Sequence, residues 1–140
     1  MITKPIYTAA LCFIFLMNFL AISAQLVKIS VFNSLPVKSV IITSYEGDYE
    51  VLGDELPVTF LEKGKNLYIS LYDGALLLNS LQGSIGKFGK LKFKATSVNQ
   101  KLRIATVEPK STSRNISDNL ELNVEYGRII LVNETDVENI

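Results

Sequence analysis

Ser84 and Lys87 have the spacing of a Ser-x-x-Lys pair, in which a lysine one helical turn after a serine accepts the serine proton during acyl transfer. That chemistry needs a helix to bring the two side chains together. Gly83, Gly86 and Gly89 recur at every third position of this segment, and each glycine destabilises a helix by about 1 kcal/mol relative to alanine. The glycines also lack the spacing of a dinucleotide or phosphate loop. The sequence therefore favours a flexible turn between strands over a catalytic site.

A second candidate is a basic segment, residues 74–107, which holds six Lys or Arg and no acid in a chain whose 14 basic and 14 acidic residues balance. Within it, Lys90, Lys92 and Lys94 alternate with apolar residues, so a strand there would present three ammonium groups on one face. Such a stripe is a candidate site for an anionic envelope polymer. The alternative is structural: lysines protect an exposed or edge strand from aggregation, and Glu121 and Glu125 on another strand would be cross-strand partners.

The residue inventory excludes several other classes of chemistry. The chain has no His, no Trp and one Cys, which rules out Ser-His-Asp or Cys-His catalysis and His-ligated or Cys-rich metal sites within it. Acidic residues cluster at 46–55, but they alternate around one hairpin turn, so we interpret them as solvated turn charges and not as a glycosidase pair or a calcium loop. We predict no catalytic residue, no metal and no cofactor. The zero net charge and dispersed aromatic residues argue against nucleic acid as a partner.

The elements that must position any site are strands. Short runs with period-2 alternation of apolar residues are separated by Gly, Pro, Asn and Asp, and helix signals are scarce. The sequence predicts an all-β fold, a small antiparallel sandwich or open barrel. The expected strands are 27–31, 39–44, 49–52, 58–61, 67–71, 90–95, 102–107, 120–126 and 128–132.

Residues 1–24 have the features of a cleaved signal peptide. Lys4 precedes nine uninterrupted apolar residues at 9–17, and Asn18 and Ser23 interrupt the run before it reaches the length of a membrane span. We expect cleavage between Ala24 and Gln25, with an uncleaved anchor as the alternative. Cys12 lies inside the apolar run, where a lipidation signal does not fit. The rest of the chain is then exported to the periplasm or beyond the cell, associated with the envelope, and has no stable membrane span after cleavage.

The exported part divides into three segments on sequence pattern. Residues 25–107 are expected to form a β-rich module, and the polar, Ser- and Thr-rich segment 108–119 is expected to be a loop or linker. Residues 120–140 then begin a further unit with a hairpin. The last residues look like the approach to a helix that Asp136 would cap.

Several phrases of the exported part resemble one known family. They are an opening strand at 26–32, a strand at 40–42, Gly-Asp-Tyr-Glu-Val at 47–51, the runs 67–71, 90–94 and 102–109, and above all the hairpin 120–134. In this order they resemble the SpoIID/LytB family (stage II sporulation protein D), in the secreted form typical of Bacteroidetes-like bacteria. The resemblance spans about residues 25–140 and is strongest at 126–134.

The resemblance implies work on peptidoglycan. Family members act as lytic transglycosylases on glycan strands stripped of their stem peptides, or as enhancers of a partner amidase. Their catalytic acid follows in a Tyr-x-x-Gly-Val-x-x-x-Glu segment that this sequence does not contain, and Glu134 and Glu138 match only the lead-in. We therefore expect a catalytically incomplete N-terminal part of a longer wall enzyme.

Two hypotheses follow. The first is the exported β-rich part of a SpoIID/LytB-type peptidoglycan-remodelling protein, whose partners are peptidoglycan or another envelope polymer and a wall amidase. The alternative is a free-standing secreted β-sandwich that binds an anionic envelope polymer, through Lys90, Lys92 and Lys94, or a protein partner.

Overall fold

The computed structural model describes residues 25–139 and confirms the all-β prediction. The strands are β1 (Leu26–Val31), β2 (Ser39–Glu46), β3 (Tyr49–Gly53), β4 (Leu56–Leu61), β5 (Asn66–Tyr72), β6 (Ala75–Ser80), β7 (Gly83–Phe88), β8 (Lys90–Ala95), β9 (Lys101–Glu108), β10 (Arg114–Ser117), β11 (Asn119–Glu125) and β12 (Arg128–Asp136). A 3-10 helix, Val137–Asn139, follows β12. The predicted signal peptide lies outside the described residues.

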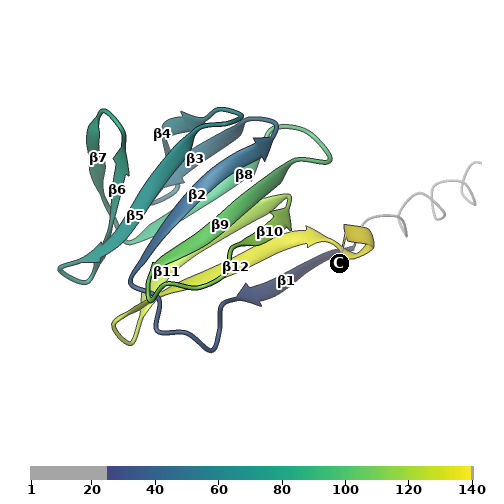
Figure 1. Ribbon diagram of the computed structural model, residues 1–140. Helices are drawn as coiled ribbons and strands as arrows, with labels where there is room; N and C mark the ends of the chain where they lie inside the picture. The colour runs from purple at the N-terminus through teal and green to yellow at the C-terminus, as the bar shows by residue number, and fades with distance from the viewer. Residues whose placement is uncertain (1–24, 140) are drawn as a thin grey trace, which may run out of the picture.

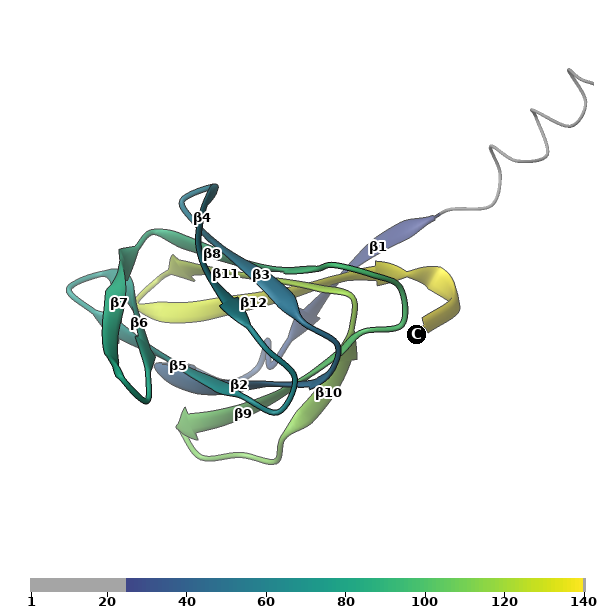
Figure 2. The same ribbon diagram turned by 90° about the horizontal axis from the view of Figure 1, so that it is seen from above.

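The strands form two antiparallel six-stranded sheets that are not closed into a barrel. Sheet A has the order β1-β12-β11-β8-β3-β4, and sheet B has the order β10-β9-β2-β5-β6-β7. Figure 1 shows β9, β2 and β5 side by side, and Figure 2 shows the two sheets as separate layers with β6 and β7 at one end. None of the helices formed by the described residues has the length and apolarity that crossing a membrane requires.

The core lies between the sheets and follows from strand periodicity. In β2, Val40 and Ile42 are buried while their neighbours are half-buried, and β12 repeats the pattern along its whole length. Phe93 from sheet A and Ile104 from sheet B are both fully buried in the one apolar cluster that the two sheets share. Burial of each such side chain stabilises the fold by about 1.5–3 kcal/mol.

Three strands, β6, β7 and β10, were not expected from sequence. The segment with the repeated glycines is not a flexible turn, because residues 83–88 form β7, paired with β6. The Phe88 ring leaves no room for a side chain at two glycine positions. A Cβ on Gly86 would lie 2.9 Å from this ring, and a Cβ on Gly53 would collide with it. The aromatic ring, not chain flexibility, requires glycine at these positions.

The predicted linker and the domain boundary also differ from the structure. Within residues 108–119, Arg114–Ser117 form β10, which pairs with β9 of sheet B. The hairpin of β11 and β12 lies inside sheet A, with β11 paired to β8 and β12 paired to β1. Leu120, Leu122 and Leu131 of this hairpin belong to the shared core. Over the described residues, the hairpin therefore completes the same sandwich as residues 25–107. Long-range pairing of this kind leaves no signal in local composition.

The C-terminal segment is partly as expected. β12 extends to Asp136, beyond the predicted end of the strand, and one 3-10 turn follows. The Asp136 Oδ1 accepts a hydrogen bond from the Glu138 backbone N–H at 3.2 Å, so Asp136 caps that turn as predicted.

Candidate functional site

The lysine stripe lies on the outer face of sheet A. Because Leu91 and Phe93 are buried, Lys90, Lys92 and Lys94 alternate with them on the opposite face of β8. β8 is a central strand, paired to β11 on one side and β3 on the other, so protection of a sheet edge does not account for the lysines.

Carboxylates from neighbouring segments pair with the stripe. The Lys90 Nζ lies 3.5 Å from Glu121 Oε1 and 3.9 Å from Glu55 Oε1. Lys92 is directly opposite Glu121, and Lys94 is directly opposite Glu50 on β3. The expected partner Glu121 is therefore confirmed, whereas Glu125 is opposite Arg128 on β12. Folding itself supplies counter-charges to the stripe, which lowers its attraction for an external polyanion.

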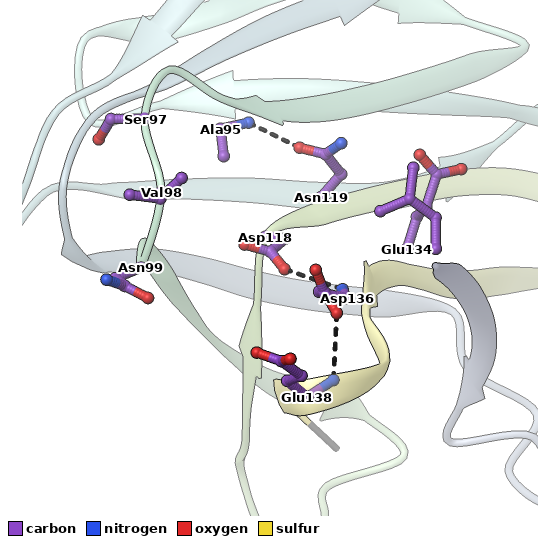
Figure 3. A pocket seen from close by; sticks show the side chains of 10 residues that line it. Ala95, Ser97, Val98, Asn99, Asp118, Asn119, Glu134, Asp136 and Glu138 are labelled. Atoms are coloured by element: carbon purple, nitrogen blue, oxygen red, sulfur yellow. Dashed lines mark hydrogen bonds between the residues drawn. The ribbon is translucent and has the colours of Figure 1, made fainter. Parts of the chain in front are cut away.

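An acidic pocket of about 380 Å³ opens at one end of sheet A (Figure 3), and its lining includes Asp118, Glu134, Asp136 and Glu138. Asp118 Oδ2 accepts hydrogen bonds from Thr135 Oγ1 at 2.6 Å and from the Asp136 backbone N–H at 3.2 Å. Among the described residues no group of three or more His, Cys, Asp or Glu is arranged to hold a metal ion. The observed bonds give Asp118 a structural role, which is to tie the start of β11 to the end of β12.

The acidic residues at 46–55 also serve local structure. Asp48 Oδ1 accepts a hydrogen bond from the Lys63 backbone N–H at 2.9 Å. Asp54 Oδ1 accepts hydrogen bonds from the backbone N–H groups of Gly89 and Lys90, each at 3.0 Å. The acidic residues lie at turns as expected, but not around one hairpin: Asp48 is in the connection from β2 of sheet B to β3 of sheet A, and Asp54 is in the β3–β4 turn. Both carboxylates hold neighbouring segments by hydrogen bonds instead of being only solvated.

The Ser84 and Lys87 pair lies on β7 and not at the start of a helix. The Lys87 Nζ lies over the Tyr72 ring, 4.4 Å from its centroid, so this ammonium makes a cation–π contact. The arrangement gives no support to acyl transfer at this pair.

A different surface stands out on the outer side of sheet B. We call it the sheet B face; its centre consists of outward side chains of β9, β2 and β5, which alternate with buried residues: Ile41, Thr43, Asn66, Tyr68, Ser70 and Ala105. Tyr68 is directly opposite Ile41 on β2 and Asn79 on β6. The sheet B face combines an aromatic ring with hydroxyl, amide and small apolar groups.

The sheet B face also differs in charge from sheet A. Glu46 and Glu108 lie near opposite ends of the β2–β9 pair, and no outward position between them on the described strands carries a carboxylate. Arg103 of β9 and Lys87 lie on either side of Tyr68, and neither forms an ion pair with any residue in the described part of the chain. The surface is therefore weakly positive, with Tyr68 near its centre.

This surface was not predicted from sequence, because its residues are dispersed along the chain and form no local aromatic cluster. The available signal was in β5, where the alternate outward positions carry Tyr68, Ser70 and Tyr72 and no charged residue. Their counterparts on β2 and β9 are far away in sequence, so only the sheet register brings them together.

Comparison with known proteins gave no match to any family model, curated protein or solved structure.

Proposed function

We propose that this protein is an exported β-sandwich that binds the glycan of the bacterial cell envelope, as the accessory part of a SpoIID/LytB-type peptidoglycan-remodelling protein. The observation that carries the proposal is the sheet B face, a broad surface with Tyr68 surrounded by amide and hydroxyl side chains. Export and the peptidoglycan context rest on the features of residues 1–24 and on the resemblance of residues 25–140.

The chemistry of this surface suits a sugar chain better than a protein partner. The fully buried core of a protein interface is more apolar than the rest of the protein surface. On the sheet B face, polar Thr43, Asn66 and Ser70 are interleaved with apolar Ile41 and the Tyr68 ring. A sugar ring has the matching mixture, because it presents C–H groups on its faces and hydroxyl groups around its edge, and a few placed polar groups beside apolar surface fix such a ligand.

Sedimentation with isolated peptidoglycan tests the proposal. We expect the wild-type protein to pellet with the insoluble wall material, and we expect Tyr68→Thr, which keeps a strand-forming residue, to stay in the supernatant. Lys92→Gln with Lys94→Gln on sheet A is the matched control and should pellet like the wild type. A wild-type protein that stays in solution would contradict the proposed function. Release of soluble wall fragments by the protein would contradict the accessory role.

Export has its own test. N-terminal sequencing of the protein recovered from the envelope or medium should begin at Gln25, which follows the expected cleavage after Ala24. Retention of the full chain in the cytoplasm would overturn the exported location.

A further inference from the structure

We infer that the sheet B face binds an acidic polysaccharide, with a sugar ring against Tyr68 and the carboxylates of the chain near Arg103 and Lys87. This inference rests on the proposed function, because it takes the ligand to be a glycan. It adds the class of glycan and the side chains that select it. It also moves the binding site for an anionic polymer away from the lysine stripe of sheet A.

The distribution of carboxylates around the basic residues carries the argument. The basic segment 74–107 has no acid of its own, and the fold divides its cations between two sheets. On sheet A, Lys90 contacts Glu121 and Glu55. Lys92 and Lys94 are directly opposite Glu121 and Glu50, although neither forms an ion pair within 4 Å among the described residues. On sheet B, Arg103 and Lys87 meet no carboxylate of the described chain within ion-pair distance. Cations that face no carboxylate favour an anionic ligand, whereas each lysine of the sheet A stripe has a carboxylate on a neighbouring strand or turn.

The two cations are placed on either side of the ring. In the sheet order, β9 is two strands from β5 on one side and β7 is two strands from β5 on the other. Strand spacing therefore puts Arg103 and Lys87 about 10 Å to each side of the β5 backbone that carries Tyr68. A chain of several sugar rings laid across the strands would pass Tyr68 and reach both cations. A single sugar would not.

Two contacts preorganise this surface. Thr43 Oγ1 donates to Asn66 Oδ1 at 2.6 Å, so the Asn66 amide accepts from its neighbour through its oxygen and keeps its N–H groups for other acceptors. The Lys87 Nζ lies 4.4 Å from the Tyr72 ring centroid, which holds this long side chain near the surface. Ordering both groups before binding reduces the entropy that a ligand must overcome.

The test compares two oligomers that differ only in charge. Oligogalacturonate of about six rings supplies carboxylates on a sugar chain, and its carboxyl-reduced form is the neutral match. We expect calorimetry to show that the acidic oligomer binds the wild type at least tenfold more tightly than the neutral one. Arg103→Gln with Lys87→Gln should remove most of this preference, and Tyr68→Thr should weaken binding of both oligomers at least tenfold.

Lys92→Gln with Lys94→Gln is the matched control, because it also removes two positive charges, but from sheet A. Its affinity for the acidic oligomer should stay within about twofold of wild type once the loss of net charge is screened by 0.15 M salt. Circular dichroism of each variant checks that the fold is kept. Equal binding of the two oligomers, or an equal loss in the sheet A control, would overturn the inference. If peptidoglycan sedimentation still depended on Tyr68 in that case, the proposed function would stand without the inference.

Discussion

The outer faces of the two sheets follow the same strand alternation, but they differ in whether their basic residues lie next to carboxylates. On sheet A, Lys90 contacts Glu121 and Glu55, and Lys94 is opposite Glu50. On sheet B, Arg103 and Lys87 flank Tyr68 with no carboxylate of the described chain in ion-pair distance. A basic residue with a partner in the fold is explained by the fold. Arg103 and Lys87 have only uncharged residues directly opposite them on the neighbouring strands, which is the difference from which we infer an external anion.

The largest expected effect is a difference in stability between substitutions on the inner and outer faces of sheet A. Phe93→Ala removes a fully buried ring from β8 and should lower the free energy of unfolding by about 3–5 kcal/mol. Lys92→Ala, one residue away on the outer face, should change it by less than about 1 kcal/mol. Urea denaturation of both variants makes the measurement. A Lys92→Ala loss as large as that of Phe93→Ala would mean that the charged face carries the stability of the sheet.

A second change acts where the two sheets meet at one side of the sandwich. Gly53 of β3 in sheet A faces the Phe88 ring of β7 in sheet B, and a Cβ at residue 53 would collide with that ring. Gly53→Ala should therefore destabilise the protein by about 1–3 kcal/mol through overpacking. Gly64→Ala is not a suitable control because its φ of +82° is itself unfavourable for alanine. Phe88→Leu combined with Gly53→Ala should recover part of the loss. Additive losses in thermal unfolding would contradict the clash.

The inner face of sheet A has a titratable group that should show in the pH dependence. Tyr49 is fully buried, its hydroxyl has no hydrogen-bond partner among the described residues, and burial, with a smaller effect of Asp118, raises its pKa above the usual 10. Above pH 10 the phenol ionises in the unfolded chain but stays protonated in the fold, so stability falls by up to about 1.4 kcal/mol per pH unit.

Tyr49→Phe removes both the unpaired hydroxyl and this titration. At neutral pH we expect it to be neutral or to stabilise by about 1 kcal/mol. Between pH 10 and 11.5 its stability should fall less steeply than that of the wild type in urea denaturation. Parallel pH profiles for the two proteins would show that Tyr49 ionises equally in both states.

The smallest effect concerns the outer ion pair itself. A double-mutant cycle on Lys90 and Glu121, both partly exposed, should give a coupling energy of about 0.2–1 kcal/mol that falls at high salt. A cycle on Arg103 and Glu121, which lie on different sheets, should give no coupling. Coupling of similar size in both cycles would remove the distinction between the two faces.

Much of the fold could be predicted from sequence because the alternation of apolar and polar residues is visible within each strand. Val40 and Ile42, or Leu120 and Leu122, mark one inward face without any knowledge of their neighbours. β7 was missed because Gly83 and Gly86 read as breakers, although Gly86 makes room for Phe88. The position of the β11–β12 hairpin within sheet A depends on pairing with β8 and β1, which no local pattern encodes.

The candidate site was less predictable than the fold. The excess of basic residues at 74–107 was visible, but which of them face a carboxylate depends on which sheet each strand joins. Glu121 could be named as a partner because its strand also alternates. Tyr68 could not be placed between Arg103 and Lys87, since that order arises only from the register of sheet B.

The most direct test of the central claim maps the bound oligomer by NMR. Addition of oligogalacturonate to the ¹⁵N-labelled protein should shift backbone amide resonances of β9, β2 and β5 around Tyr68, and leave those of β8 and β11 around Lys92 nearly unchanged. The reverse pattern, with shifts centred on Lys90, Lys92 and Lys94, would contradict the account and return the binding site to sheet A.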